Sequence, residues 1–265
     1  MKDEELLGGI RDGNYHAGGI RCLQLFRLEN SYANELQAEV ERLCRTEQGS
    51  NVSDPNHVTN WTRPRGSVFQ FSLLNTSGSF NDTSIDHEVT CFGKRFHASE
   101  KYPRLSELIA SFPDTINFRL NVLGPRARLS PHEEHSVIRT AAGSVGIRAR
   151  FHLPITTNPR ADLMLDGSIY HLPANVIHFV NHGCVHSACN GGDENRIHIV
   201  WDMLLTRRVF DVMFADDVCA PMLVRIAESD RQVTPLRVER IGAHLRLPPL
   251  VPRAEAEQIG FCDVQ

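Results

Sequence analysis

Hydrophobic and polar residues alternate in short segments along much of this 265-residue chain, which is the pattern of half-buried strands. The pattern appears at 19–28 and 67–74, and it recurs in closely spaced segments from residue 115 onward. These later segments are 116–123, 147–154, 161–165, 168–172, 176–180 and 196–205. Short strands separated by Gly, Asn, Asp and Pro turns predict an antiparallel sandwich or barrel. Strands and helices do not alternate in this region, which argues against a doubly wound nucleotide-binding fold.

Other segments carry apolar residues at intervals of three and four, as one face of an amphipathic helix does. Those residues are Leu36, Val40 and Leu43, then Leu105, Leu108 and Ile109, and, beyond residue 206, Val209, Val212, Met213, Leu223 and Ile226. The sequence therefore predicts a mainly β protein with flanking helices. We expect residues 1–206 to form the β domain with N-terminal helical additions, and residues 207–265 to form a small C-terminal helical region.

The charge pattern narrows the class of partner. The formal net charge is -4 and there is no long run of Lys or Arg, so the electrostatic footprint of a nucleic-acid binder is missing. No segment is apolar for the length that a secretory signal or a membrane span requires. We therefore expect a cytoplasmic protein without a nucleic-acid or membrane partner. Seven cysteines without a CxxC pair argue against both a disulfide framework and a four-thiolate zinc site.

Histidine is concentrated in one part of the chain. Eight of the thirteen histidines fall between residues 129 and 202, namely His132, His135, His152, His171, His178, His182, His186 and His198. Histidine is the side chain whose nitrogen binds metals and moves protons near neutral pH. A concentration of this kind in roughly a quarter of the chain indicates a functional site in the segment of closely spaced strands.

Three of the residues in this segment form a possible iron site. Two histidines and one carboxylate on adjacent strands make a facial ligand set for iron(II) that leaves positions open for other ligands. His132 and Glu134 are two residues apart, so they point the same way from an extended backbone. His186 follows 54 positions after His132, and a rolled sandwich can bring such distant strands together.

One arginine adds a carboxylate-binding group to the possible iron site. Arg196 lies ten residues after His186, at the start of the apolar strand that includes Trp201. A buried guanidinium needs a carboxylate to neutralise it, because an unpaired buried charge is very costly. A dicarboxylate that chelates iron at one end and pairs with Arg196 at the other meets both requirements, and 2-oxoglutarate is the obvious candidate.

The ordered set of motifs resembles a known family. These motifs are Pro131-His132, Glu134, Arg150-Phe151-His152, His186-Ser187-Ala188-Cys189-Asn190 and the segment from Arg196 to Asp202. They resemble the aspartyl/asparaginyl β-hydroxylases, a family of iron(II)- and 2-oxoglutarate-dependent oxygenases. Within that family the chain is more similar to the bacterial branch that includes L-proline cis-4-hydroxylase and other free amino-acid hydroxylases. The resemblance covers roughly residues 115–206 and implies a double-stranded β-helix core of the jelly-roll or cupin type.

The resemblance also implies roles for individual residues. His132 and His186 match iron ligands, and Arg196 matches the residue that pairs with the distal carboxylate of 2-oxoglutarate. Arg150 and His152 match an Arg-x-His element that contributes to binding of the co-substrate or the substrate carboxylate. Glu134 departs from the family, because the hydroxylases proper lack a third protein ligand and the proline-hydroxylase branch carries Asp there.

The resemblance implies hydroxylation of a C–H bond in a small amino acid or amino-acid derivative, with Fe(II), 2-oxoglutarate and O2. Besides Arg150, the expected substrate residues are Arg63, Trp61 and Gln70. Trp61 and Arg63 lie in a polar loop where an aromatic ring and arginines could hold a carboxylate; the alternative is an ordinary packed loop with solvated charges.

Several alternatives remain open from the sequence. His178, His182 and His186 are four residues apart and would form a zinc stripe on a helix, although the β-branched residues around them favour a strand and a turn. Cys184 and Cys189 flank His186 and would form a zinc cluster or be buried thiols. Arg196 is alternatively paired with Asp193 or Glu194.

Alternative functions use the same residues differently. Cyclisation or desaturation in natural-product biosynthesis would use the same ligands, a cupin-like binding module would need no open metal positions, and a zinc hydrolase would use Glu133 or Glu134 as its base.

The tail after residue 206 is expected either to cap the site or to form a contact between two copies of the chain, and the sequence does not decide between them.

Overall fold

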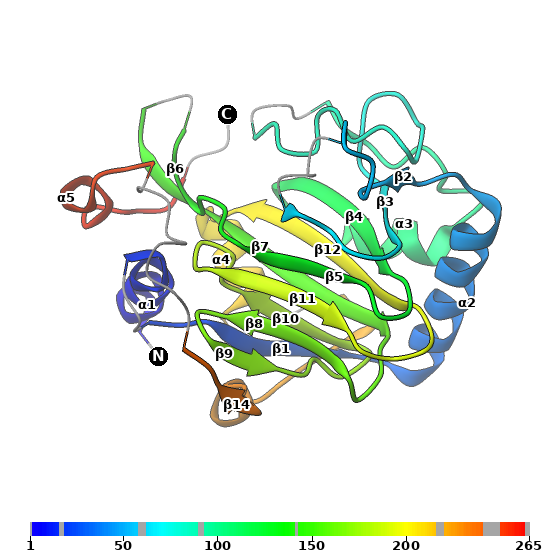
Figure 1. Cartoon of the computed structure of the whole chain (residues 1–265). Coiled ribbons are helices and arrows are strands. Elements are labelled where there is room, and N and C mark those ends of the chain that lie inside the picture. The colour runs from blue at the N-terminus through cyan, green and yellow to red at the C-terminus, as the bar shows by residue number, and fades with distance from the viewer. Residues whose placement is uncertain are drawn as a thin grey trace.

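Two antiparallel β-sheets form the body of the protein in a computed structural model, which describes residues 2–15, 19–57, 62–89, 93–140, 143–215, 220–240 and 250–262 (Figure 1). In order across the larger sheet, the strands are β13 (Leu223–Arg225), β1 (Cys22–Leu28), β10 (Val176–Val180), β7 (Val145–Thr156), β12 (Arg196–Leu204), β4 (Thr115–Leu123), β3 (Val68–Ser72) and β2 (Ser50–Asn51), with β6 (Val137–Arg139) paired to β7. The smaller sheet has the order β14 (Arg237–Val238), β9 (Ser168–Tyr170), β8 (Ala161–Leu165), β11 (His186–Asn190) and β5 (Arg128–His132).

Helices flank the larger sheet. They are α1 (Asp3–Tyr15), α2 (Asn30–Thr46), α3 (Pro103–Ala110), α4 (Arg207–Met213) and α5 (Arg253–Ala256), and a short 3-10 helix spans Glu228–Asp230. The apolar faces of α2, α3 and α4 pack into one hydrophobic cluster with the larger sheet. Within the described residues, no helix has both the length and the apolar character that a bilayer crossing requires.

Side chains on β12 alternate between two different environments, although the whole strand is buried. Ile199 and Trp201 point into the hydrophobic cluster beneath the helices, where the Trp201 ring stacks on Phe118 with centroids 5.0 Å apart. Alternate residues of a strand point to opposite faces, so Arg196 and Asp202 lie on the other face, toward the smaller sheet. The larger sheet therefore has an apolar face under the helices and a polar face that is also buried.

The smaller sheet covers this polar face. Its strands β8 and β9 are joined by the two-residue turn Asp166-Gly167, in which both residues have positive φ (47° and 84°), as a tight hairpin of this kind requires. The next pairing in the sheet places His186 of β11 directly opposite His132 of β5. The pairing thus brings together two strands that are distant in sequence.

The structure confirms the predicted fold class, a mainly β protein with a jelly-roll core and flanking helices. The alternating segments are strands, and the periodic segments at Leu36 and Leu105 lie in helices. The helix expected after residue 206 is α4, but the helix predicted from the periodicity at Leu223 is wrong: that residue lies in strand β13, which pairs with β1. Only three residues long, β13 is too short to show an alternating pattern. The proposed division at residue 206 into two regions stays a prediction.

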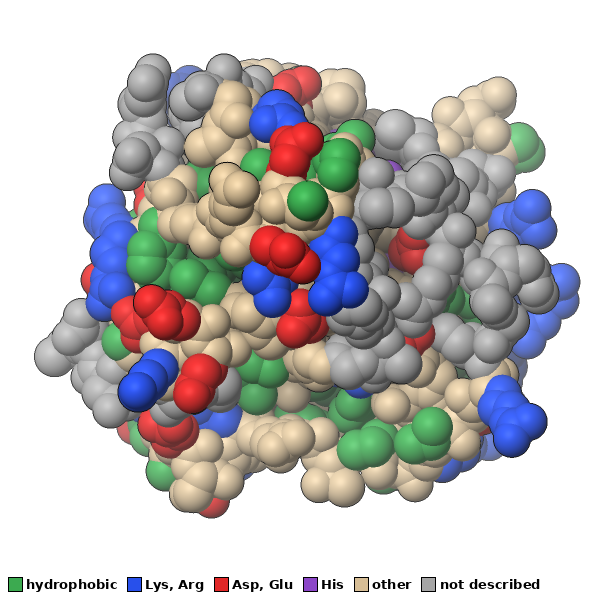
Figure 2. All heavy atoms as spheres, turned by 90° about the vertical axis from the view of Figure 1, so that its left-hand side faces the viewer, with side chains coloured by type: hydrophobic (Ala, Val, Ile, Leu, Met, Phe, Trp, Pro, Cys, Tyr) green, Lys and Arg blue, Asp and Glu red, His purple; other side chains and the backbone are tan. Residues whose placement is uncertain are grey.

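Charges of both signs are interspersed on the side of the molecule that carries α1 and α5 (Figure 2). Arg207 on α4 pairs there with Asp3 on α1, and Arg139 on β6 pairs with Glu255 on α5. These exposed pairs connect the terminal helices to the body of the protein, and each contributes little to stability because both partners are solvated.

Candidate active site

Three of the predicted ligands converge between the ends of β5 and β11. Single ligand atoms of His132, Glu134 and His186 lie within 4.8 Å of one another. The two imidazole rings have centroids 4.2 Å apart, a consequence of the β5–β11 register. Glu134 follows β5 and is positioned by its backbone N–H, which donates to the carbonyl of His182 at 3.3 Å. No other such group of three His, Cys, Asp or Glu is found among the described residues.

The protonation of the two histidines suits a metal ligand. His132 Nδ1 lies 2.7 Å from the carbonyl oxygen of Ser130, and His186 Nδ1 lies 2.8 Å from that of Cys184. A carbonyl oxygen can only accept, so each Nδ1 carries the proton and each Nε2 carries the lone pair. Burial lowers the pKa of His132 and, together with His132 itself, lowers the pKa of His186 to about 3. Both rings are therefore neutral, the form that binds a divalent metal.

Glu134 is held by two arginines. Arg150 donates to both carboxylate oxygens, at 2.9 Å to Oε1 and 2.8 Å to Oε2, and Arg148 donates to Oε2 at 3.0 Å. Burial would raise the pKa of Glu134, but the positive charges of Arg150 and Arg148 hold it well below the usual range. A carboxylate offers about four lone-pair positions, so these three hydrogen bonds leave a metal-binding position on Oε1. The arginines and a metal can therefore share this carboxylate.

We expect Glu134→Gln to lower the affinity for cobalt(II) by about 10- to 100-fold, because a neutral amide is a much weaker ligand than a carboxylate. Titration of the d–d absorption of cobalt(II) measures this affinity. The matched control is Glu133→Gln, which changes the adjacent carboxylate outside the cluster and should leave the affinity unchanged. Equal affinities in the two variants would show that Glu134 is not a ligand.

Arg196 is buried without a carboxylate partner. Its side chain is 3% exposed, and it makes no hydrogen bond or ion pair with any described residue. The alternative pairing with Asp193 is wrong, because Asp193 instead pairs with Arg126 and Arg160 on the surface. Burial lowers the pKa of Arg196 to about 10, which still leaves the guanidinium charged at neutral pH.

Both sheets line one cavity that contains these groups. His132, Glu134 and His186 lie on the side of the smaller sheet, and Arg196 and His152 lie on the larger sheet. Burial and the neighbouring Arg196 hold the pKa of His152 well below its usual range, so this ring is neutral as well. The two walls of the cavity thus offer different chemistry: neutral nitrogen and carboxylate ligands on the side of the smaller sheet, and on the larger sheet a guanidinium without a carboxylate partner among the described residues.

The remaining predicted residues have different positions. Arg150 lines the cavity, but its guanidinium is occupied by Glu134 and by both carboxylate oxygens of Asp202, at 2.7 and 2.9 Å. Gln70 also lines the cavity. The Arg63 side chain is exposed and is not part of the lining. Trp61 lies outside the described residues, so the substrate roles of these residues stay predictions.

Two alternative metal sites are not supported. His178 lies on strand β10 and His182 in the turn that follows it, so they do not form a helical stripe with His186. Both are buried, and burial lowers their pKa values. Cys184 and Cys189, which flank His186 in sequence, do not belong to the metal-ligand cluster.

Asn190, the last residue of the His-x-x-x-Asn motif, has a structural role. Its side-chain Nδ2 donates to the carbonyl oxygens of Leu123, Gly124 and Glu194 at 2.7–2.9 Å. These bonds connect the end of β11 to the end of β4 and to the turn that leads into β12. Asn190 therefore sets the path of the chain from His186 to Arg196.

Several cavity residues were missed at the level of sequence. Arg119 and Asn121 are two of them. They belong to a pattern, an Arg followed two residues later by Asn or His, which occurs on three neighbouring strands as Arg119-Leu120-Asn121, Arg150-Phe151-His152 and Arg196-Ile197-His198, and of which Arg150, His152 and Arg196 are predicted site residues. The register aligns these strands so that all six polar residues are on the face toward the smaller sheet. The repeated pattern was a usable signal, but an alternating strand usually has its polar side in water. His87, in a loop, also lines the cavity and had no such signal.

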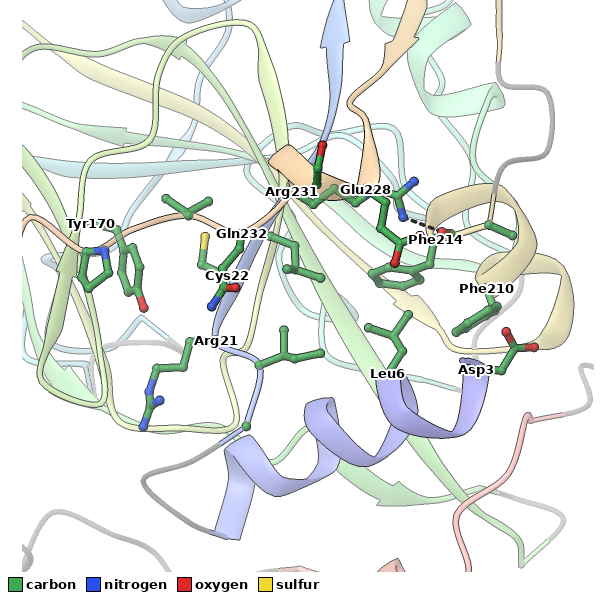
Figure 3. A pocket seen from close by; sticks show the side chains of 17 residues that line it. Asp3, Leu6, Arg21, Cys22, Tyr170, Phe210, Phe214, Glu228, Arg231 and Gln232 are labelled. Atoms are coloured by element: carbon green, nitrogen blue, oxygen red, sulfur yellow. Dashed lines mark hydrogen bonds between the residues drawn. The ribbon is translucent and has the colours of Figure 1, made fainter. Parts of the chain in front are cut away.

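A second cavity, of about 620 Å³, lies elsewhere and does not share a lining residue with the first (Figure 3). It is bounded by α1, the start of β1, α4 and the segment around Arg231. Its charged groups are already paired, for example Arg21 with Asp166 at 2.6 Å. The metal-ligand cluster of the described residues does not extend into this cavity.

Comparison with known proteins agrees with the motifs. Residues 33–205 match the family described as aspartyl/asparaginyl beta-hydroxylase. The match covers more than half of the chain, and the protein therefore belongs to this family. No curated protein sequence matches the chain significantly.

Solved structures that align with the chain have low sequence identity to it. The non-heme alpha ketoglutarate dependent epimerase SnoN from nogalamycin biosynthesis is 13% identical, with 87% of this chain and 97% of SnoN covered and a TM-score of 0.45. A Pseudomonas putida prolyl-4-hydroxylase is 11% identical, with 75% and 99% covered and a TM-score of 0.40. A cupin 2 conserved barrel domain protein from Salinispora arenicola is 20% identical over 32% of this chain and 60% of its own, with a TM-score of 0.24.

Proposed function

We propose that the protein is an Fe(II)- and 2-oxoglutarate-dependent dioxygenase that hydroxylates a C–H bond of a small amino acid or amino-acid derivative. The single observation that carries this proposal is the presence, in one cavity, of the His132–Glu134–His186 cluster and of buried Arg196, which has no carboxylate partner among the described residues. Membership of the hydroxylase family supports it. The small-molecule substrate rests on the resemblance to the free amino-acid hydroxylases.

The residues present fit this cofactor set. Iron(II) would be held by His132, Glu134 and His186, and a facial set of this type is the usual one in non-heme iron oxygenases. When bound, iron(II) with 2-oxoglutarate and O2 supplies the oxidising power, while 2-oxoglutarate is converted to succinate and CO2. Arg196 would bind the distal carboxylate, because a buried guanidinium gains most from a charged, planar acceptor. His152, neutral and close to Arg196, would donate or accept one further hydrogen bond.

The test is succinate formation from 2-oxoglutarate in air with added iron(II), screened across the free amino acids. We expect at least one amino acid to stimulate succinate formation and to gain one oxygen atom. A product that has lost two hydrogen atoms would instead identify a desaturase or cyclase. Tight zinc stoichiometry without turnover would favour the hydrolase, and binding without turnover would favour the cupin-like module.

We expect Arg196→Ala to weaken 2-oxoglutarate binding by about 10- to 100-fold, because charge-assisted hydrogen bonds to a carboxylate are lost. Calorimetric titration of the manganese(II)-loaded protein without O2 measures this affinity. The control Arg160→Ala removes an exposed arginine outside the cavity and should leave the affinity for 2-oxoglutarate unchanged. If Arg196→Ala binds 2-oxoglutarate as well as the wild type, and no amino acid stimulates turnover, the oxygenase proposal fails.

A further inference from the structure

Arg119 is a second buried arginine without adequate partners. It is 4% exposed on β4 and lines the same cavity as the metal-ligand cluster. Among the described residues its Nε has no hydrogen-bond partner, and its one ion pair is a long contact of 3.8 Å between Nη2 and Asp202 Oδ2. A guanidinium has five N–H donors, and burying them without acceptors is costly. Arg150, which also lines the cavity, and Arg148 are by contrast hydrogen-bonded to Glu134.

We propose that Arg119 is the carboxylate-binding residue of the substrate subsite, and that this subsite selects a substrate with a net negative charge. The inference rests on the proposed function, because it assigns Arg196 to 2-oxoglutarate and leaves Arg119 for the substrate. The expected substrate is an acidic amino acid, or an amino acid whose amine is acylated, rather than a zwitterion without net charge.

The position of Arg119 separates it from the Arg196 site. In the β4–β12 register Arg196 lies opposite Leu123, four residues beyond Arg119 on the same strand. At about 3.4 Å per residue, the two arginines leave the sheet about 14 Å apart along the strands. They therefore enter the cavity from different positions, and we assign each to a different carboxylate.

A second orphaned polar atom lies beside Arg119. Asn121 is on the same face of β4 two residues away, and its buried Oδ1 has no hydrogen-bond partner in the part of the chain that the structure describes. An amide oxygen accepts an N–H, so Asn121 suits the amine or acylated nitrogen of an amino acid whose carboxylate is on Arg119. Both residues line the cavity, as does His87, whose pKa is lowered to about 4 by burial and by Arg119 and which is therefore neutral.

The balance of buried charge determines the sign of the expected substrate. Four buried arginines surround or support the cavity, namely Arg119, Arg148, Arg150 and Arg196. The carboxylates that face them are Glu134, Asp202 and Asp86, the last held by Gln70 and Ser72 at 2.7 Å each. Even when all three are ionised, one positive charge remains.

A divalent metal and the dianion 2-oxoglutarate cancel each other, so the excess is still one positive charge when both are bound. Uncompensated buried charge is strongly unfavourable, and one negative charge on the substrate would neutralise the cavity. A zwitterion would leave the excess in place, because it brings its own ammonium group.

The test compares three forms of each amino acid with a neutral side chain: the N-acetyl amino acid, the free amino acid and the amino-acid amide, which carry net charges of about -1, 0 and +1 at neutral pH. L-glutamate and L-glutamine form a further pair that differs by one charge at nearly equal shape. Binding to the manganese(II)- and 2-oxoglutarate-loaded protein is measured by calorimetry without O2. We expect the anionic member of at least one set to bind at least about tenfold more tightly than its neutral counterpart.

Variants test whether Arg119 is responsible. Arg119→Gln should lower the affinity for the preferred anionic probe by about 10- to 100-fold and abolish the preference for anionic over neutral probes. The affinity for 2-oxoglutarate should be unchanged. Arg119→Lys keeps the charge without the planar fork, so it should retain the preference with reduced affinity. Arg160→Gln is the matched control on the surface and should behave like the wild type.

The outcomes separate this inference from the proposed function. Failure of the wild type to bind 2-oxoglutarate overturns the proposed function itself. If 2-oxoglutarate binds but no anionic probe binds, or if the zwitterionic forms bind equally well, the wild-type protein alone overturns the Arg119 inference. If a folded Arg119→Gln variant loses binding of both 2-oxoglutarate and the anionic probe, the Arg119 inference is also overturned, because Arg119 would then belong to the co-substrate site.

Discussion

Replacing His132 or His186 with alanine is expected to lower cobalt(II) affinity by at least about 100-fold and to abolish turnover. Loss of residues that merely orient metal ligands costs about 10- to 100-fold, and loss of a ligand itself should exceed that range. The two ring centroids are 4.2 Å apart, and each Nδ1 donates its proton to a backbone carbonyl, so each ring keeps the lone pair of Nε2 for a metal. Spectroscopic titration with cobalt(II) gives the affinity without requiring a substrate.

The control for this prediction is His135→Ala. His135 is three residues after His132 but is not part of the ligand cluster. Its substitution should leave cobalt(II) affinity within about twofold of the wild type, since it removes no metal contact. If His135→Ala loses the metal while Glu134→Gln keeps it, the ligand assignment at this end of β5 is wrong.

Asp202→Asn is expected to lower the free energy of unfolding by about 3–5 kcal/mol, because it leaves buried guanidinium charge uncompensated. Asp202 is fully buried, accepts two hydrogen bonds from Arg150 and one from Asn117, and is 3.8 Å from Arg119. Burial would raise its pKa, but Arg150 holds that pKa well below the usual range. Chemical denaturation, with the midpoint and slope both fitted, measures the loss.

An exposed aspartate with two arginine partners provides a matched control. Asp193 pairs with Arg126 and Arg160, but its side chain is 70% exposed, so solvent screens these pairs. Asp193→Asn should leave the denaturation midpoint essentially unchanged. If Asp193→Asn changes the midpoint as much as Asp202→Asn does, burial is not the reason for the larger stabilisation expected from Asp202.

Much of the fold could be predicted from local patterns. The apolar spacing at Leu36, Val40 and Leu43 predicts a helix, and these residues lie on the buried face of α2. The alternation of 196–205 predicts a strand, which is β12. Both signals are strong because a periodic apolar face must be buried by one specific secondary structure. By contrast, β13 at Leu223 is a strand because β1 provides a partner, and no local pattern records that.

The candidate site was predictable only in part. His132, Glu134, His186 and Arg196 could be selected because their residue types and spacing match a chemical requirement. Arg119 could not be distinguished from an ordinary solvated arginine on an alternating strand. What distinguishes it is the smaller sheet, which covers this polar face and excludes water from its guanidinium.

The sequence by itself determined the class of fold and the identity of the metal-ligand candidates, because both depend on residue type and short-range spacing. Only the tertiary structure decided which buried charges are satisfied. Arg150 is paired with Glu134 and Asp202, whereas Arg119 and Arg196 lack comparable partners among the described residues. The physical reason is that the energy of a buried charge depends on its partners in space, and strand register across two sheets sets those partners.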